Sequence, residues 1–301
     1  MPVFKLFFTA MASRCEICLA AADAVAAQSL AQSAVDEVLR IEATYSRYRP
    51  DSVLCGINAQ AGRDWVTCDD ETLHLLHIAA SLFDRSGGLF DATSGVLRRA
   101  WHAQQTQAPL PAALQDLCAL VGWPGVQRRG RQVRLARAGM ELDFGGFGKE
   151  YAADQAAGVL QAQGVRHAYV NLGGDIRAIG PHPDGQAWSI GIQDPQHPGR
   201  LIASLRLAEG GLATSGDYER FLALEGRRYG HILDPHSGQP VAFWRSASVL
   251  ADTALEAGAL ATIAMLQQAQ APAFLQEQGV QYLLVDQAGV LHGNPQAKLP
   301  A

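Results

Sequence analysis

Residues 143–151 read Asp-Phe-Gly-Gly-Phe-Gly-Lys-Glu-Tyr and predict the point where a strand passes into a helix. Glycines at three of four successive positions let a ligand approach the backbone closely, and the free amides at the start of a helix attract an anion. The stretch is not a P-loop, because Glu150 stands where serine or threonine should follow Gly-Lys. It also differs from the dinucleotide-binding Gly-x-Gly-x-x-Gly pattern. Taken alone, it is equally typical of an ordinary glycine-rich turn.

Outward from this stretch, the spacing of apolar residues predicts a mixture of helices and strands. Helices are predicted over residues 23–48, 69–86, 149–163 and 253–268, and strands over 167–172, 187–193, 201–207, 228–233 and 246–250. Hairpins are predicted over 130–144 and 280–291. Because most strands follow one another through turns rather than helices, we expect an α+β fold with mixed, mainly antiparallel sheets packed against helices.

The composition is that of a folded protein of moderate charge. Of the 301 residues, 48% are hydrophobic and 18% are charged, which provides a core and excludes global disorder. The net charge of −5 argues against a nucleic-acid binder that relies on a basic surface. The apolar runs fall short of the roughly 18 residues of a membrane span. The five cysteines do not form a disulfide scaffold, and Cys15 and Cys18 should point to opposite faces of a strand.

The first twelve residues allow two interpretations. Ala10-Met11-Ala12 resembles the small-residue cleavage site of a secretory signal. The apolar run that leads to it begins only at Leu6, however, so a first β-strand explains the segment better. We therefore expect the chain to remain in the cytoplasm, with export to the periplasm as the less favoured alternative.

Three further segments place polar side chains beside glycine turns. They read Asn-Leu-Gly-Gly-Asp at 171–175, Ala-Thr-Ser-Gly-Asp-Tyr at 213–218 and His-Ile-Leu-Asp-Pro-His-Ser-Gly-Gln-Pro at 231–240. Each by itself is compatible with a plain turn or bulge. His231 stands at the end of a predicted strand, and an imidazole, which titrates near neutral pH, is suited to acid–base chemistry.

Taken together, these segments resemble the ApbE family, the FAD:protein FMN transferases, over most of the chain. Residues 143–154 match the family's D-x-x-x-x-x-K-G-Y-A-x-D pattern, with Glu150 in place of its usual glycine. The other three segments match N-x-G-G-D, A-T-S-G-D-Y and H-I-x-D-P-x-T-G-x-P, the last with Ser237 for threonine. Residues 48–58, 88–93 and 9–13 resemble the family's Y-x-P-D-S…N, G-x-F-D-x-T and A-M-G-T segments, with Ala12 for glycine.

The resemblance implies a single domain over residues 1–301 with a T-fold-related, ApbE-like α+β architecture. It implies an enzyme that binds FAD and Mg²⁺, transfers FMN to a Ser or Thr hydroxyl of an acceptor flavoprotein, and releases AMP. His231 is expected to act as the general base. The residues expected to contact FAD are Met11, Tyr48, Leu89, Phe90, Asp91, Asp143, Lys149 and Ile232. Lys149 and the metal would offset the negative charge of the pyrophosphate.

The metal site departs from the family's pattern. Gly258 stands where the helix motif A-D-A-L-A/D-T carries a metal-binding aspartate, which leaves Thr262 and the backbone carbonyl of Gly146 as matching ligands. Glu256, two residues away on the helix, should point elsewhere. Either water replaces the lost ligand, or the Mg²⁺ site is weakened or lost. We expect Gly258→Asp to tighten Mg²⁺ binding and to raise activity at low Mg²⁺ concentration.

Two alternatives to protein flavinylation follow from the same residues. One is metal-dependent hydrolysis of FAD to FMN and AMP, with water as the acceptor. The other is a FAD-binding protein without catalysis, because Gly258 replaces the expected metal ligand. Covalent FMN on an acceptor protein would distinguish the transferase from both, and AMP release without an acceptor would identify the hydrolase.

Overall fold

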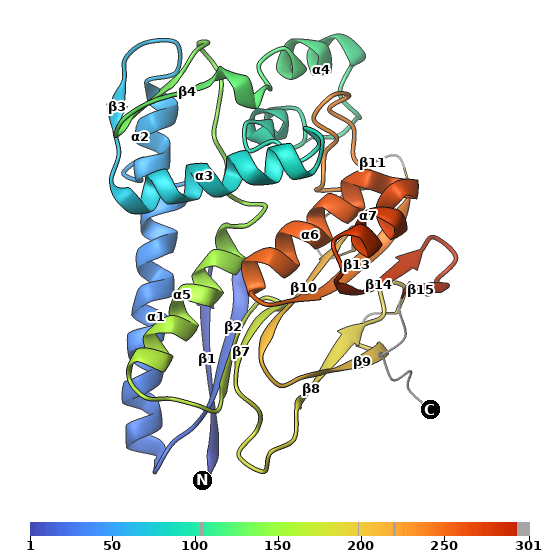
Figure 1. Ribbon diagram of the computed structural model, residues 1–301. Helices are drawn as coiled ribbons and strands as arrows, with labels where there is room; N and C mark the ends of the chain where they lie inside the picture. The colour runs from blue at the N-terminus through green and yellow to red at the C-terminus, as the bar shows by residue number, and fades with distance from the viewer. Residues whose placement is uncertain (103–104, 198, 219–220, 225, 294–301) are drawn as a thin grey trace.

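An eight-stranded antiparallel sheet forms the centre of the molecule (Figure 1). The computed structural model describes residues 1–102, 105–197, 199–218, 221–224 and 226–293. The strand order is β1 (Val3–Ala10), β2 (Ser13–Ala20), β6 (Ala168–Leu172), β7 (Asp175–Ile179), β10 (Gly210–Gly216), β13 (Trp244–Ala251), β14 (Gln281–Asp286) and β15 (Leu291–Gly293). Each strand pairs antiparallel with its neighbours, which confirms the predicted α+β class with mainly antiparallel sheets.

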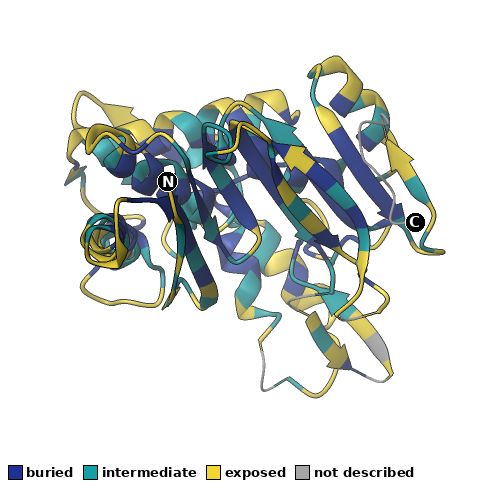
Figure 2. Cartoon of the chain, turned by 90° about the horizontal axis from the view of Figure 1, so that it is seen from below, coloured by how far each residue is buried: buried dark blue, intermediate teal, exposed yellow. Residues whose placement is uncertain are grey.

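Three helices cover one face of this sheet: α1 (Ala24–Tyr45), α5 (Gly148–Ala162) and α6 (Ala254–Gln267) (Figure 1). The small side chains of Ala27, Ala31 and Ala34 lie buried on one stripe of α1, which allows it to approach α5 closely. Figure 2 shows the buried residues concentrated along the strands and on the helix faces against them. α6 is buried on nearly all sides, as expected for an apolar helix in the middle of a core.

The opposite face of the sheet has a separate, smaller apolar core. The hairpin formed by β8 (Trp188–Gln193) and β9 (Leu201–Leu207) covers it. Trp188 packs edge-on against Tyr169, with ring centroids 5.1 Å apart. Cys15 belongs to the core under the helices and Cys18 to the core under the hairpin, so the predicted opposite orientation of these two thiols is confirmed.

A smaller layer packs at one end of the sheet (Figure 1). It holds α2 (Val53–Ala59), α3 (Asp70–Arg85), η1 (Ser94–Arg99), α4 (Pro111–Cys118), η2 (Trp123–Gly125) and a three-stranded sheet in the order β3 (Val66–Thr67), β5 (Gln132–Leu135), β4 (Val126–Arg129). The remaining elements are β11 (Phe221–Leu224), β12 (Arg227–Gly230), η3 (Gln268–Gln270) and α7 (Ala271–Glu277).

The predicted hairpin over residues 130–144 is wrong. β5 pairs instead with the preceding β4 through a turn at Gly130, whose φ is +56°. Residues 140–144 run as an irregular segment because other partners hold their amides. The Asp143 amide donates to the Ala92 carbonyl at 2.8 Å, and the Leu142 amide donates to Asn58 Oδ1 at 2.7 Å. The local alternation of apolar residues did not reveal these distant partners.

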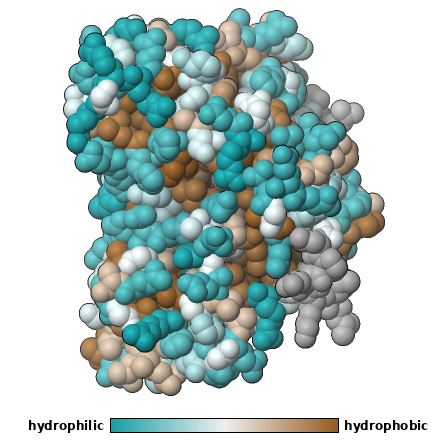
Figure 3. Space-filling model, viewed as in Figure 1, coloured by the Kyte–Doolittle hydropathy of each residue, from teal (hydrophilic) through white to brown (hydrophobic). Residues whose placement is uncertain are grey.

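Element boundaries shift by a few residues from the predictions. The first helix ends at Tyr45 rather than at residue 48, and the predicted strand 228–233 ends at Gly230, leaving an isolated bridge between Leu233 and Pro240. All five cysteines are free thiols. Among the described residues, no helix is long and apolar enough to cross a bilayer. On the face seen in Figure 3, hydrophilic side chains predominate and interrupt the apolar patches.

Candidate functional site

A cavity of about 330 Å³ lies where the β1–β2 turn, the end of α1, the segment before α5 and the side of α6 meet. All eleven residues to which the sequence assigns a role with FAD, catalysis or metal line it. They are Met11, Tyr48, Leu89, Phe90, Asp91, Asp143, Gly146, Lys149, His231, Ile232 and Thr262. The fold thus brings together residues from segments far apart in the sequence, while their individual roles stay predictions.

The tight turn between β1 and β2 places Met11 in the cavity wall. Ala10 pairs with Ser13, so Met11 and Ala12 form a two-residue hairpin loop, and their φ values are +50° and +55°. Such a loop matches the twist of the strands but favours glycine, because a Cβ is strained at positive φ. The Met11 amide donates to Glu42 Oε1 at 2.9 Å, which ties the strained turn to α1.

The glycine segment after Asp143 bends round the cavity and starts α5. Gly146 lies so close to Phe90 that a Cβ there would be 2.8 Å from the phenyl ring. The Gly148 amide donates to the Phe144 carbonyl at 2.6 Å and closes the turn from which α5 begins. Glycine is therefore required at 146 for packing, and the start of α5 faces the cavity, where its amides suit an anion.

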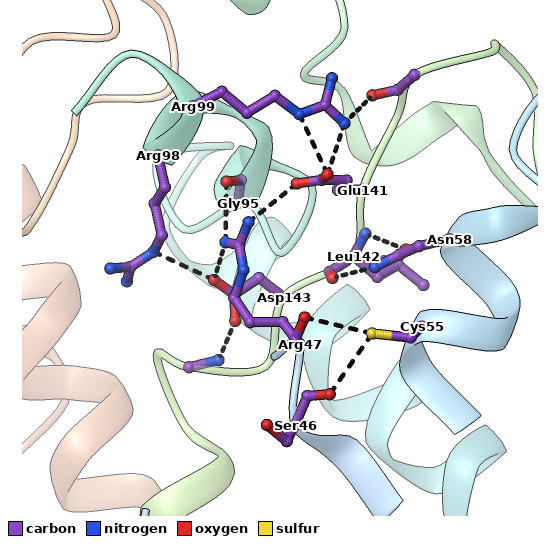
Figure 4. A network of polar contacts seen from close by, with 12 residues as sticks. Ser46, Arg47, Cys55, Asn58, Gly95, Arg98, Arg99, Glu141, Leu142 and Asp143 are labelled. Carbon is purple, nitrogen blue, oxygen red and sulfur yellow. Dashed lines mark hydrogen bonds and ion pairs between the residues drawn. The ribbon is translucent and has the colours of Figure 1, made fainter. Parts of the chain in front are cut away.

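A network of arginines and carboxylates fixes the position of this segment (Figure 4). Asp143 Oδ2 accepts a hydrogen bond from Arg47 Nη1 at 2.8 Å and lies 3.2 Å from Arg98 Nε. Arg47 also reaches Glu141 at 3.0 Å through its second terminal nitrogen. The other Asp143 oxygen accepts from the Gly145 amide at 2.8 Å. The predicted FAD contact Asp143 therefore also fixes the glycine segment and two arginines at the cavity.

The Asp143 carboxylate is stabilised in its charged form. Burial by itself would favour the neutral acid, but the charges of Arg98 and Arg47 and the Gly145 amide outweigh it, so the pKa of Asp143 lies below its usual value. Next to it, the Asn58 side-chain amide donates to the Leu142 carbonyl at 2.9 Å and accepts from the Leu142 amide at 2.7 Å. The segment is thus clamped on both sides.

Asp91, another predicted FAD contact, accepts hydrogen bonds from Thr93 in its own loop and from Trp123. Its buried carboxylate accepts hydrogen bonds from the Thr93 amide at 2.7 Å, the Thr93 hydroxyl at 2.6 Å and the Trp123 amide at 2.9 Å. These bonds fix the loop that presents Leu89 and Phe90 to the cavity. The local role of Asp91 is therefore to shape the wall.

His231 and Ile232 come from the loop that follows β12. This loop is closed by a turn in which the Gly238 amide donates to the Asp234 carbonyl at 2.8 Å, and the Val241 amide donates to the Ile232 carbonyl at 3.0 Å. Trp101 secures the turn from outside, because its indole Nε1 donates to the Gly238 carbonyl at 2.8 Å. A short, cross-braced loop thus presents His231 to the cavity.

Tyr48 stands at the rim of the cavity and is 79% exposed. Its ring centroid lies 5.8 Å from the guanidinium carbon of Arg47. An exposed aromatic ring beside a cation is a surface on which a planar ring system can stack.

Lys149, Glu150 and Asp175 form one part of the cavity wall, called here the acidic corner. Lys149 Nζ pairs with Asp175 Oδ2 at 2.8 Å, and both residues line the cavity together with Glu150. Glu150 is only 6% exposed, and among the described residues its Oε2 has no hydrogen-bond partner. Burial raises the pKa of Glu150 well above its usual value, the Asp175 carboxylate adds to this, and Lys149 opposes it. One lysine thus faces two buried carboxylates.

Two hydroxyls extend this corner towards α6. Ser215 Oγ and Thr262 Oγ1 lie 2.9 Å apart in hydrogen-bond contact, and both residues line the cavity. Gly258, one turn before Thr262, packs against the Glu150 side chain, and a Cβ at 258 would be 2.4 Å from Glu150 Cγ. Glu256 points away and lies 3.5 Å from Arg85, as the sequence predicts.

The donors at this corner fit a hard divalent cation such as Mg²⁺, which prefers oxygen ligands and keeps several waters. They are carboxylates and hydroxyls, with the Gly146 residue in the same cavity. In the part of the chain that the structure describes, no three His, Cys, Asp or Glu side chains gather as a metal site. The buried, unpartnered oxygen of Glu150 is the feature that favours a cation here.

Sequence reasoning missed several residues of this cavity. Asp175 and Ser215 lie within matched motifs and could have been assigned a role from them. Arg47 and Arg98 belong to no motif that the sequence shows. They come together only in the folded protein, where both contact Asp143. Glu150 was noted only as a departure from the expected glycine.

Known proteins resemble this chain in sequence. The profile of the ApbE family matches residues 11–284. A Treponema pallidum protein named FAD:protein FMN transferase is 34% identical over 255 residues, which cover 76% of this chain and 70% of that protein. A Rhodobacter capsulatus protein of the same name is 32% identical, and its match covers 74% of this chain and 44% of the relative.

Solved structures agree with these matches in fold. The ApbE protein from Thermotoga maritima superposes with a TM-score of 0.91 at 27% identity, covering 98% of this chain and 97% of that one. The flavinyl transferase ApbE from Pseudomonas stutzeri gives a TM-score of 0.86 at 27% identity, with 98% and 95% covered. With a family match over nearly the whole chain and the family's motifs gathered at one cavity, this chain belongs to the ApbE family.

Proposed function

We infer that this protein transfers the FMN moiety of FAD to an acceptor flavoprotein and releases AMP. The observation that carries the inference is the gathering round one cavity of the eleven residues to which the family resemblance assigns a role, in a chain of the ApbE family. FAD is the substrate, and a Ser or Thr hydroxyl of the acceptor is the proposed target. The name FAD:protein FMN transferase of the relatives supports this assignment.

The cavity has the chemical character that FAD requires. Phe90 and Leu89 give it an apolar wall, and the exposed Tyr48 ring at its rim offers a stacking surface. Arg47, Arg98 and Lys149 supply positive charge, and the start of α5 supplies amides. Because a pyrophosphate carries negative charge between two ring systems, we expect its phosphates near these cations and the start of α5.

The reaction requires a phosphoryl substitution with one proton transfer. The acceptor hydroxyl oxygen forms a bond to the phosphorus on the FMN side of the pyrophosphate, the P–O bond to the AMP phosphate breaks, and AMP leaves with the bonding electrons. His231 would take the hydroxyl proton at a ring nitrogen, and Lys149 would offset charge on the phosphates. Mg²⁺, when bound beside Thr262 and the Gly146 carbonyl, would supply further positive charge at the pyrophosphate.

The test combines purified protein, FAD and Mg²⁺ with a co-expressed candidate acceptor flavoprotein. Intact-mass measurement should show the acceptor heavier by FMN minus water, with AMP released in equal amount. AMP release without any acceptor would instead indicate FAD hydrolysis. FAD binding with neither product would contradict the proposed enzyme and leave a FAD-binding protein.

For the cell compartment, we propose that the protein acts in the cytoplasm. The support is that Val3–Ala10 form β1 of the central sheet and that Met11 lines the cavity. Cleavage after Ala12 would remove both, so the segment has a structural role in the folded enzyme.

A further inference from the structure

Two departures from the family's pattern, on different helices, occupy the same volume. Glu150 on α5 replaces the usual glycine, and Gly258 on α6 replaces the usual aspartate. A Cβ at Gly258 would lie 2.4 Å from Glu150 Cγ and 2.6 Å from Glu150 Oε1. The Glu150 side chain therefore fills the space that a side chain at 258 would need.

The Glu150 carboxylate has features of a ligand. Glu150 is only 6% exposed and lines the cavity. Among the described residues, its Oε2 lacks a hydrogen-bond partner. Leaving a buried carboxylate oxygen unpaired is unfavourable unless a cation or a proton satisfies it. Glu150 Oε2 is therefore an atom at which a bound cation would relieve the cost of burial.

The surroundings of Glu150 supply the other donors that a divalent cation needs. Asp175 is close enough to act on its charge, and Lys149 pairs with Asp175 at 2.8 Å. The hydroxyls of Ser215 and Thr262 line the same cavity from β10 and α6. A cation that binds Glu150 in its ionised form would meet two carboxylates against one lysine, and the hydroxyls add further oxygen donors.

We propose that Glu150 is the carboxylate ligand of Mg²⁺ in this protein, delivered from α5 in place of the aspartate expected at position 258 on α6. The proposal rests on the proposed function, because Mg²⁺ would act there on the FAD pyrophosphate. The site is then moved from one helix to its neighbour rather than weakened. The expectation that Gly258→Asp alone tightens binding changes with it, since the new side chain would collide with Glu150.

A competing explanation is that Glu150 only fills the space beside Gly258 as an uncharged acid. Glutamine has nearly the same shape and cannot carry the charge, so Glu150→Gln separates the two explanations. The reciprocal double variant Glu150→Gly/Gly258→Asp returns the carboxylate to α6 and removes the collision. Glu256→Gln is the matched control, because that carboxylate lies on α6 but faces Arg85 instead of the cavity.

The measurement is Mn²⁺ binding, followed by the loss of the free-ion electron paramagnetic resonance signal, with and without FAD. Removal of outer-shell partners already lowers metal affinity about 10–100-fold, so Glu150→Gln should weaken Mn²⁺ binding at least about tenfold. The double variant should bind within about threefold of the original protein, since it restores one carboxylate. Glu256→Gln should be unchanged, and thermal unfolding without metal should show that each variant folds.

Glu150→Gln with unaltered Mn²⁺ affinity would overturn the proposal, as would a protein that binds no Mn²⁺ in either condition. A folded double variant that does not regain binding would overturn the exchange between helices. The outcome is separate from that of FMN transfer. A protein whose Mn²⁺ affinity depends on Glu150 but which modifies no acceptor would refute the proposed function alone, and an active transferase indifferent to Glu150→Gln would refute this inference alone.

Discussion

Asp154 on α5 caps α6 from the neighbouring helix: its Oδ1 accepts a hydrogen bond from the Ala254 amide at 2.9 Å. Its Oδ2 accepts from the next amide, that of Leu255, also at 2.9 Å. The hydroxyl of Thr253, the residue just before α6, accepts from a third amide, that of Glu256, at 3.1 Å. Because the first amides of a helix lack partners within it, this arrangement fixes α6 against α5 and sets the position of Gly258 relative to Glu150.

Replacing Asp154 should therefore destabilise the protein. We expect Asp154→Ala to lower the free energy of unfolding by about 1–2 kcal/mol, because two partly buried amides of α6 lose their acceptor. Urea unfolding followed by circular dichroism measures the change. Asp51→Ala is the control, since this exposed carboxylate pairs with Arg49 at the surface and should matter by less than about 0.5 kcal/mol. Equal effects of the two variants would refute the cap.

The Arg47–Asp143 pair predicts a pH-dependent effect on stability. Asp143→Asn removes one of the two carboxylates that pair with the largely buried Arg47, the other being Glu141, and should lower the free energy of unfolding by about 2 kcal/mol at neutral pH. The pKa of Asp143 is depressed in the folded protein, so its contribution is full above the unfolded-state pKa, about 3.9. It is lost as the pH falls through the lower folded-state value.

The check is the unfolding of both proteins in urea at about pH 7 and about pH 3. The difference between the original protein and Asp143→Asn should shrink at the lower pH. A difference that stays constant or grows on acidification would show that the charge of Asp143 is not what stabilises the segment 143–148.

The strained turn at Met11 and Ala12 predicts a stabilising substitution. Ala12→Gly should raise the free energy of unfolding by about 0.5–1 kcal/mol, because relief of the positive φ exceeds the added flexibility of the unfolded chain. Ala10→Gly, in the strand just before the turn, should lower it by about 0.5–1 kcal/mol. Thermal unfolding of the two variants compares them, and a loss of stability in both would contradict the strain at Ala12.

The proposed role of His231 predicts a separation of binding from catalysis. His231→Ala should leave FAD affinity, measured by calorimetry, nearly unchanged and should slow FMN transfer about 10²–10⁴-fold. His236→Ala, in the same loop but exposed, should leave both quantities unchanged. An unaltered transfer rate in His231→Ala would remove the general-base role, and loss of FAD binding would indicate a structural one.

The position of β1 predicts that the mature protein keeps residues 3–12. Since Val3–Ala10 form a strand and Met11 bonds to Glu42, the native protein should retain these residues. Intact-mass measurement of protein purified from its own cells tests this. A mature chain that begins at Ser13 would show cleavage after Ala12 and would contradict both the cytoplasmic proposal and the role of Met11.

The motifs predicted which residues would meet, because each motif is a short segment whose spacing a turn or a helix start preserves. His231 and Lys149 are examples, and both line the cavity. The predicted helices and most strands also form, since apolar periodicity follows local burial. The hairpin over 130–144 was predicted wrongly because its second strand is held by Asn58 and Ala92, and no local pattern shows such distant partners.

The relation between Glu150 and Gly258 shows why other features of the site could not be predicted from the sequence. Each residue departs from a different motif. Taken alone, Glu150 indicates only a missing glycine, and Gly258 indicates only a missing metal ligand. Only the packing of α5 against α6 shows that one residue fills the space left by the other. The cationic pair Arg47 and Arg98 was hidden for the same reason, because it exists only round Asp143.

The shared volume at Glu150 and Gly258 also limits the routes by which such a sequence can arise. Starting from glycine at 150 and aspartate at 258, a single change to glutamate at 150 crowds the two helices. A single change to glycine at 258 leaves room but removes the carboxylate. Each single substitution therefore impairs the protein, either in packing or in metal binding. We accordingly expect lineages to carry both substitutions or neither. Surveys that judge such chains by position 258 alone would misclassify those that carry both as degenerate descendants.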